Sequence, residues 1–355
     1  MAEQEARDVV MRGVNLLTNQ GLDLEGRVMT EADVRQIAQW GMSVIRAGFC
    51  RVENPDRPFE YNEEAFKRID GCLDWCEKYG VRCILCMWDD ETSVWGLARS
   101  PGKVWSDKQL QERFTKLWAA VAERYKDRPT TLYFELMNEP RAVEHEDWNR
   151  LARSATEAIR AVNQRHTIIV ESNKWGSTKT FPDLKPTGDP NTIYSFHFYD
   201  PIIFTNQHAP WMIAFSQFYT ETVPYPGAPP RLDEYIARLP GYTDQVSRRD
   251  LENSRGVWDK DRLEGLLEAP LEFSQKHGAP LFCGEFGANW RAPRESALNW
   301  LGDVLDLFSK HGVSWTYWYY RDMDFGIFDN LRLDYTSPPD YLDREKLDLL
   351  LQGIG

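Results

Sequence analysis

Short apolar runs alternate with amphipathic segments along most of the chain. Eight runs of strand-like length predict buried strands, at residues 9–17, 42–49, 81–88, 131–137, 167–172, 192–199, 280–286 and 314–320. Apolar residues at helical spacing follow nearly all of them and predict helices over about 30–40, 62–79, 107–126, 146–164, 260–277, 294–311 and 343–351. Thr30 is the expected N-cap of the first helix.

This alternation is typical of an α/β protein, and eight strands trailed by helices match a (β/α)8 TIM barrel better than an open doubly wound sheet. No glycine-rich GxGxxG sequence follows the first run, which argues against a dinucleotide-binding sheet. A chain of 355 residues could make two domains, but α/β barrels of this length fold as one. We therefore expect residues 1–355 to form a single barrel domain.

A long segment, 200–258, interrupts the alternation after the sixth run. It is rich in proline and aromatic residues, so we expect an irregular loop insertion there. Insertions of this length in a compact domain often serve function, and this one could form a lid over a binding site. The segment after the fifth run is also too rich in glycine and proline for a regular helix.

Charge and aromatic content narrow the class of ligand. The formal net charge is −13, so we expect neither a nucleic-acid nor a membrane partner, since both are bound through dense Lys/Arg patches. Fourteen tryptophans are many, and flat aromatic rings stack on sugars as well as in cores. Six tryptophans fall in expected loops, where a row of rings would suit a carbohydrate chain: Trp95, Trp105, Trp175, Trp211, Trp258 and Trp290.

The six cysteines and six histidines do not predict a metal centre. Cys83 and Cys86 have the spacing of a CxxC pair, but they lie within an expected strand, where residues three apart point to opposite faces. Buried free thiols are the better interpretation. The histidines show no ligand spacing, so we expect no metal and no cofactor.

The start of the chain, MAEQEARDVV, is polar and charged, and no later stretch is long and apolar enough to span a membrane. We therefore expect a protein of the cytoplasm, or a secreted one if a signal peptide was removed. We expect it to be a monomer.

Polar side chains follow several predicted strands at their carboxyl ends. In "LYFELMNEPR" an apolar run ends in Asn138 and Glu139, and Pro140 stops it. In "FCGEFG" Glu285 lies inside another apolar run, where an unpaired carboxylate is costly. A barrel brings strand ends to one face, where barrel enzymes bind ligands. In chain order these residues are Asn15, Arg46, Asn138, Glu139, His197, Tyr199, Glu285 and Trp318.

Taken singly, these residues have structural explanations. Arg46 could be a buried ion-pair partner, and His197 and Tyr199, two apart on one strand face, could be a hydrogen-bonded core pair. Two glutamates at separate strand ends of one barrel, however, are what a glycosidase requires: one acid protonates the leaving oxygen while the other carboxylate attacks the anomeric carbon. In retaining enzymes the two carboxyls lie about 5–5.5 Å apart, and in inverting enzymes they lie farther apart.

The segments "LMNEP", "HFY", "GEFG" and "YW", in this order, resemble glycoside hydrolase family 5, the cellulase and mannanase family of retaining (β/α)8 glycosidases. The resemblance covers residues 9–351. It implies that Glu139 is the acid/base and Glu285 the nucleophile, and that the charge of Glu285 helps to keep Glu139 protonated. It further implies that Asn138 holds the 2-hydroxyl of the sugar at the cleavage point.

The same resemblance implies supporting roles for other strand-end residues. Tyr199 would donate to Glu285, His197 would hydrogen bond near the acid/base, and Arg46 would orient the nucleophile and keep it ionised. Trp318 would form the stacking floor beneath the sugar. We also expect Asn15 and Trp175 among the residues that bind substrate.

The third strand departs from the family pattern. Family members commonly end this strand with Asp-x-His, whereas this chain has "CMWDDE", with Cys86 and Trp88 at those places. Trp88 could stack on sugar, and the hydroxyl contact of the missing histidine could pass to Asp89, Asp90 or Glu91. The departure leaves the choice of sugar open.

These features lead to the expectation of a retaining endo-β-1,4-glycosidase acting on a β-linked oligo- or polysaccharide, with glucan or glucomannan as first choice. Mannan, xyloglucan and a short or unusual β-glycoside are alternatives. A non-catalytic carbohydrate-binding barrel is the alternative of another class, but it would not need both Glu139 and Glu285.

Overall fold

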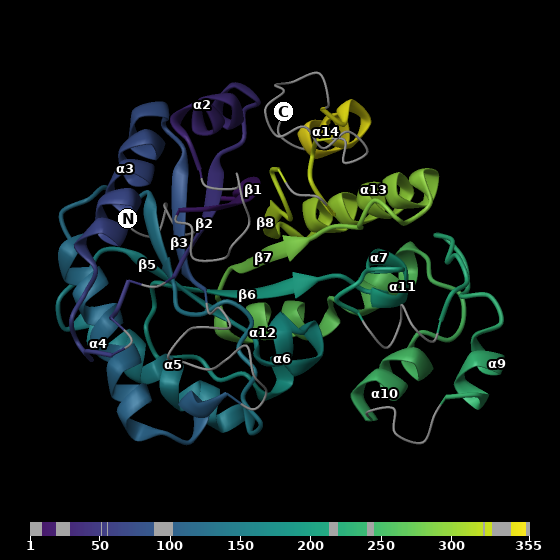
Figure 1. Ribbon diagram of the computed structural model, residues 1–355, viewed down its shortest axis with the longest axis horizontal. Helices are drawn as coiled ribbons and strands as arrows, with labels where there is room; N and C mark the ends of the chain where they lie inside the picture. The colour runs from purple at the N-terminus through teal and green to yellow at the C-terminus, as the bar shows by residue number, and fades with distance from the viewer. Residues whose placement is uncertain are drawn as a thin grey trace. The chain divides into compact units, whose positions relative to one another are not determined.

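The computed structural model describes residues 9–18, 29–50, 52–54, 56–88, 102–212, 219–239, 245–321, 324–328 and 342–352. Its strands form a closed barrel in chain order, β1 to β8, and their pairing is parallel (Figure 1). The strands are β1 (Arg12–Leu17), β2 (Val44–Phe49), β3 (Arg82–Met87), β4 (Leu132–Glu135), β5 (Thr167–Glu171), β6 (Thr192–Phe198), β7 (Leu281–Phe286) and β8 (Ser314–Tyr317). The predicted (β/α)8 barrel is confirmed.

The helices that follow the strands also match the sequence pattern. They are α2 (Glu31–Gln39), α3 (Glu63–Tyr79), α4 (Lys108–Arg124), α5 (His145–Arg160), α11 (Lys260–Gly265), α12 (Glu268–His277), α13 (Arg294–His311) and α14 (Arg344–Gln352). Thr30 caps α2 as expected: its side chain accepts from the Asp33 N–H, and Asp33 in return accepts from the Thr30 N–H, which is a capping box.

Two predictions about helices need correction. The helix expected over 260–277 is two helices, α11 and α12, and Pro270 lies in the first turn of the second, where its missing N–H costs no hydrogen bond. The segment 200–258 is not wholly irregular. It contains the short helices α7 (Ile202–Thr205), α9 (Leu232–Ala237) and α10 (Gln245–Asn253), which are too short for a clear apolar period.

After β5 the chain forms only short turns, as predicted. These are α6 (Asn173–Gly176) and the 3-10 helix η3 (Thr178–Asp183). Lys174, Trp175 and Gly176 all have positive φ, at 56°, 61° and 65°, so this loop turns in the left-handed region that most side chains avoid.

The chain divides into two compact units. The first comprises residues 1–197, 269–284 and 312–317, and the second comprises 198–268, 285–311 and 318–355. Nearly all barrel strand residues belong to the first unit, in which α3, α4 and α5 lie along the outside of the strands (Figure 1). The prediction of a single domain stays a prediction.

The interior of the barrel has two layers of side chains, two residues apart on the same strands, as the alternation of a strand requires. We call the first the apolar layer; it consists of Met11, Val44, Ile84, Tyr133, Ile169, Ile193 and Phe282, all buried against one another. We call the second the polar layer; it consists of Arg46, Cys86, Glu135, Glu171 and Ser195, each fully buried. The polar layer lies two residues further along the strands than the apolar layer, and is therefore nearer to their carboxyl ends.

All six cysteines are buried free thiols, as predicted. Cys83 interacts with Cys76 of α3, whereas Cys86 faces Arg46 inside the barrel, so the two members of the CxxC spacing do point apart. Among the described residues, no helix is both long enough and apolar enough to cross a membrane.

Candidate active site

The turn that carries Glu139 is fixed by backbone contacts on both sides. The Asn138 N–H donates to the Met87 carbonyl at 2.8 Å, which ties the end of β4 to the end of β3. Glu139 adopts φ 49°, and its N–H donates to the Glu171 carboxylate at 3.1 Å. A residue with positive φ persists only where its neighbours stabilise that conformation. The hydrogen bond from the Glu139 N–H to Glu171 is one such stabilising contact.

Arg46 is the cation at the centre of the polar layer. Its Nε donates to Glu135 at 2.6 Å, and its Nη2 donates to Asn138 Oδ1 at 2.8 Å. The guanidinium and the Glu135 carboxylate are both wholly buried, so each compensates the charge of the other. Because Oδ1 of Asn138 accepts from Arg46, its amide NH2 group remains to donate to a ligand.

Asn15 and Cys86 complete the surroundings of Arg46. Arg46 Nη1 donates to Asn15 Oδ1 at 3.0 Å, and Asn15 Nδ2 lies within hydrogen-bonding distance of the carbonyls of Gly284, Thr316 and Tyr317. Arg46 Nη2 lies 3.2 Å from Cys86 Sγ. Asn15 is buried and engaged through both ends of its amide, which makes it a support for Arg46 and for the strand backbone.

His197 lies between two carboxylates. Its Nδ1 is 3.1 Å from Glu139 Oε1, and its Nε2 is 3.3 Å from Glu171 Oε2. Its side chain is almost fully buried, whereas about a third of the Glu139 side chain is exposed. Glu139 therefore presents a carboxyl group to ligand while the histidine holds it from behind, and the predicted contact of His197 with Glu139 is present.

The two carboxyls beside His197 have opposite pKa shifts. For Glu171, burial raises the pKa to about 7 against the lowering effects of His197 and Arg46. For Glu139, burial acts upward, but the hydrogen bond and charge of His197, with Arg141 and Arg46, outweigh it and lower the pKa. In the free site these contacts favour an ionised Glu139, and the expected influence of Glu285 on its protonation stays a prediction.

Glu285 lies on β7 and receives a hydrogen bond from Tyr199. The Tyr199 hydroxyl donates to Glu285 Oε2 at 3.0 Å, which is the contact that the resemblance implied. Trp318, directly after β8, is half-buried, and its N–H donates to the Phe286 carbonyl at 3.0 Å. Tyrosine donation favours the charged form of the glutamate.

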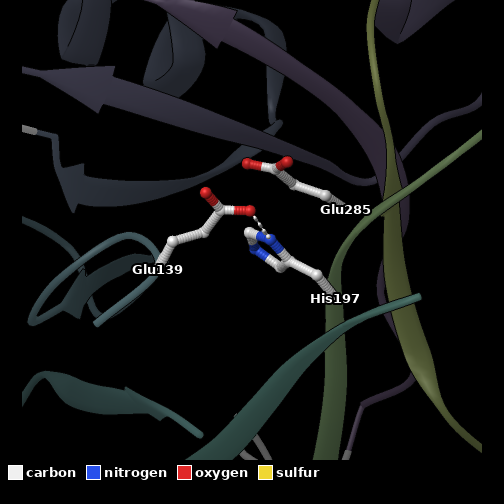
Figure 2. A group of neighbouring side chains, drawn as sticks. All are labelled: Glu139, His197 and Glu285. Atoms are coloured by element: carbon white, nitrogen blue, oxygen red, sulfur yellow. Dashed lines mark hydrogen bonds and ion pairs between the residues drawn. The ribbon is translucent and has the colours of Figure 1, made fainter. Parts of the chain in front are cut away.

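Figure 2 shows the ring of His197 beside the carboxyl group of Glu139, with the hydrogen bond between them dashed. Glu139, His197 and Glu285 carry the oxygen and nitrogen atoms that cations bind, but we do not assign them as metal ligands. His197 and Glu139 already hydrogen bond each other, and Tyr199 occupies an oxygen of Glu285.

The loop tryptophans divide into exposed and buried groups. Trp175, Trp211 and Trp290 are 44%, 46% and 47% exposed, so their rings are available for stacking. Trp105 and Trp258 are buried, so their rings are not exposed for stacking. Trp95 lies outside the described residues.

Trp88 is half-buried at the end of β3. It lies close over Gly48 of β2, where an added Cβ would come within 3.0 Å of its Cδ1. The neighbouring carboxylates Asp89, Asp90 and Glu91, proposed to replace the missing histidine, lie outside the described residues.

Sequence reasoning missed two buried carboxylates of the polar layer, Glu135 and Glu171. Both are completely buried and both contact residues that were predicted to act in the site. The sequence does indicate them: each is a glutamate within an apolar strand, as Glu285 is, and an unpaired carboxylate is costly there. Each is the last residue of its strand, β4 or β5, but the predicted strands extend past them to residues 137 and 172, so neither stood out as a strand-end residue.

Comparison with known proteins places these features in a family. The model of the cellulase family, glycosyl hydrolase family 5, matches residues 3–324. Endoglucanase C of Acetivibrio thermocellus is 30% identical over 314 residues, covering 86% of this chain and 87% of the relative. Cellodextrinase A of Ruminococcus flavefaciens is 27% identical over 290 residues, covering 80% of this chain and 76% of the relative.

Solved structures agree with the sequence matches. Endoglucanase Cel5A of Thermotoga maritima is 27% identical, with a TM-score of 0.75 over 98% of this chain and 99% of that chain. The same protein has been solved with mannotriose, with a TM-score of 0.75 and 26% identity. From the match along nearly the whole chain, together with the barrel and its paired glutamates, we conclude that the chain belongs to glycosyl hydrolase family 5 and is a glycoside hydrolase.

Proposed function

We propose that the chain is a retaining endo-β-1,4-glucanase in which Glu139 is the acid/base and Glu285 the nucleophile. The observation that carries the proposal is that the two strand-end glutamates have different partners, His197 beside Glu139 and Tyr199 beside Glu285. Retention of configuration is what membership of glycosyl hydrolase family 5 implies for such a pair of glutamates.

The surroundings of the two carboxyls fit different roles. Tyr199 donates to Glu285, which supports an ionised carboxylate that attacks the anomeric carbon. Glu139 is held by His197, which can pass it a proton. In the first step Glu139 protonates the leaving oxygen as Glu285 forms a bond to the anomeric carbon of the sugar. In the second step Glu139 takes a proton from a water that attacks the same carbon, and the bond between Glu285 and the sugar breaks.

Asn138 and three tryptophans are the proposed sugar contacts. The amide NH2 group of Asn138, oriented by Arg46, would donate to the 2-hydroxyl, a contact that strengthens in the transition state. Trp318 and Trp88 are half-buried near the strand ends and would stack on sugar rings. The exposed Trp175 would stack near the acid/base, because its backbone N–H donates to the carbonyl of Pro140 at 3.2 Å and so ties its loop to the residue after Glu139.

A series of neighbouring aromatic rings connects Tyr199, beside the proposed nucleophile, with the insertion after β6. The ring of Tyr199 lies 5.8 Å from that of Phe325, which lies 6.0 Å from that of Trp211 in the insertion. An exposed Trp211 at the end of this series would bind a further sugar unit of a chain. This favours a polymer over a single glycoside.

Glucan is the first substrate to test, because the relatives include endoglucanases and a cellodextrinase. Mannan is the second candidate, since the Thermotoga maritima enzyme has been solved with mannotriose. Trp88, in place of the usual histidine, is the residue through which this chain could prefer one sugar over the other.

The test is release of reducing sugar from carboxymethyl-cellulose, barley β-glucan, glucomannan, galactomannan and xyloglucan. We expect activity on the glucans that Glu285→Ala abolishes and that azide partly restores by replacing the nucleophile. Glu139→Gln should slow substrates with poor leaving groups far more than activated aryl glycosides. Undiminished activity of Glu285→Ala would refute the nucleophile assignment, and equal losses on both substrate types would refute the acid role.

A further inference from the structure

Glu171 is a third carboxylate of the site, and the two-glutamate mechanism does not use it. It is completely buried at the end of β5. Its Oε1 accepts from the Glu139 N–H at 3.1 Å, and its Oε2 lies 3.3 Å from His197 Nε2. It therefore contacts Glu139 directly through the backbone N–H, and it also contacts His197, whose other ring nitrogen lies against the Glu139 carboxyl.

The chain is built closely around this contact. Gly176 has φ 65°, and a Cβ there would come within 2.5 Å of Glu171 Oε1, 2.8 Å of the His197 backbone nitrogen and 3.1 Å of the ring atom Cγ of His197. A Cβ on Gly284 would lie 3.1 Å from His197 Nε2. Two glycines thus leave the room in which the carboxylate and the imidazole meet.

The charges around Glu171 and His197 favour an additional proton on one of these groups. The titratable and charged groups of the same compact unit that face them are Arg46 from β2, Cys86 from β3, and Glu135, Glu139 and Arg141 from β4 and the turn after it. With Glu171 this makes three carboxyls around the cations Arg46 and His197, and Arg141 acts on Glu139. Arg46 pairs with Glu135, so an additional proton is favoured among the remaining groups.

We propose that Glu171 is a positioning residue for the acid/base, holding His197 so that the imidazole keeps the proton that Glu139 delivers to the leaving oxygen. The inference rests on the proposed function. In the free site His197 carries protons on both nitrogens, Nδ1–H toward Glu139 and Nε2–H toward Glu171. The raised pKa of Glu171, to about 7, supports a carboxyl that becomes charged only toward neutral pH.

The proton steps balance. The His197 Nδ1–H bond breaks as a Glu139 Oε1–H bond forms, which leaves a neutral imidazole with its remaining proton facing Glu171. Glu139 then gives this proton to the leaving oxygen as the glycosidic bond breaks. In the second step Glu139 takes a proton from the attacking water and returns it to Nδ1, which restores the free site.

The experiment compares kcat/KM for cello-oligosaccharide hydrolysis between about pH 5 and pH 9 for wild type and Glu171→Gln. We expect similar values near pH 5, where Glu171 is itself neutral. Toward pH 8 the variant should fall about tenfold below wild type, because without the negative charge the shared proton is lost about one pH unit earlier. The alkaline limb of the profile therefore moves to lower pH.

Glu53→Gln is the matched control. Glu53 is also a buried glutamate, paired with Arg113 at 3.1 Å, but it has no contact with Glu139 or His197 among those of the described residues. We expect it to leave the shape of the pH profile unchanged. A loss in Glu171→Gln by the same factor at every pH, or no loss at any pH, would overturn the inference.

Nitrogen NMR of the wild-type imidazole tests the proton arrangement without relying on the folding of a variant. With His197 assigned by its replacement, we expect Nε2 to stay protonated throughout and Nδ1 to carry a proton up to neutral pH. An unprotonated Nε2 would overturn the inference. If wild type hydrolyses none of the polysaccharides, the proposed function fails, and the NMR result still decides how the proton is held.

Discussion

The apolar and polar layers of the barrel are made by the same strands, two residues apart, yet they follow different rules. Ile169 and Glu171 on β5 illustrate this: both are completely buried. Ile169 packs in a cluster of apolar side chains, where contact with any apolar neighbour of the right size is favourable. Glu171 contacts particular atoms of Glu139 and His197, and only that arrangement compensates its burial.

With one layer of each kind, the barrel holds charged groups for a reaction and still keeps an apolar core. The apolar layer stabilises the fold through area removed from water. The polar layer gives up some of that stabilisation, since a buried ion pair is rarely better than apolar packing. In return its charged groups hold Asn138, Glu139 and His197 in fixed geometry at the strand ends.

The largest effect is expected from removing the central cation of the polar layer. Arg46→Met leaves Glu135 buried without its 2.6 Å partner, and breaking a buried pair in this way costs about 3–5 kcal/mol of unfolding free energy. Calorimetry should show a large fall in Tm. The double variant Arg46→Met/Glu135→Leu should regain much of the stability while activity stays low. A double variant no more stable than the single one would contradict this account of the layer.

Glu171→Gln should change the pH dependence of stability. The folded-state pKa of Glu171 is raised to about 7, so its contribution is fully present below the unfolded pKa, near 4.5, and is lost as pH rises through about 7. Wild type and variant should therefore match near pH 4. Toward pH 8 wild type should lose up to about 3 kcal/mol relative to the variant. Denaturant titrations at several pH values measure this difference, and a constant difference would count against it.

Ile169→Val should give the smallest change in unfolding free energy, and it tests the contrast between the apolar and the polar layer. Removing one methyl group from the apolar layer costs about 1 kcal/mol, and nothing in that change depends on a charge. We expect the same loss of unfolding free energy at every pH and an unchanged kcat. A pH-dependent loss, or a fall in kcat, would show that the two layers are more closely coupled than their contacts indicate.

The sequence pattern predicted the strands because each apolar run is buried on both sides in a parallel barrel. It predicted α13 to the residue and α3 within one. It failed where local signals are short: α9 has only Leu232 and Ile236 buried, which is too little to show a period. It gave no indication that Trp105 and Trp258 are buried, because exposure of a loop residue depends on what other segments cover it.

The sequence by itself determined the barrel, the family resemblance and the two glutamates at strand ends, because strand period and strand order are local properties that fix where a barrel presents its side chains. Only the tertiary structure decided the rest. It placed Glu171 behind His197, turned Asn15 into a support for Arg46, and lowered the pKa of Glu139. These outcomes depend on which side chains meet across strands, and burial and charge act through such distances rather than through position along the chain.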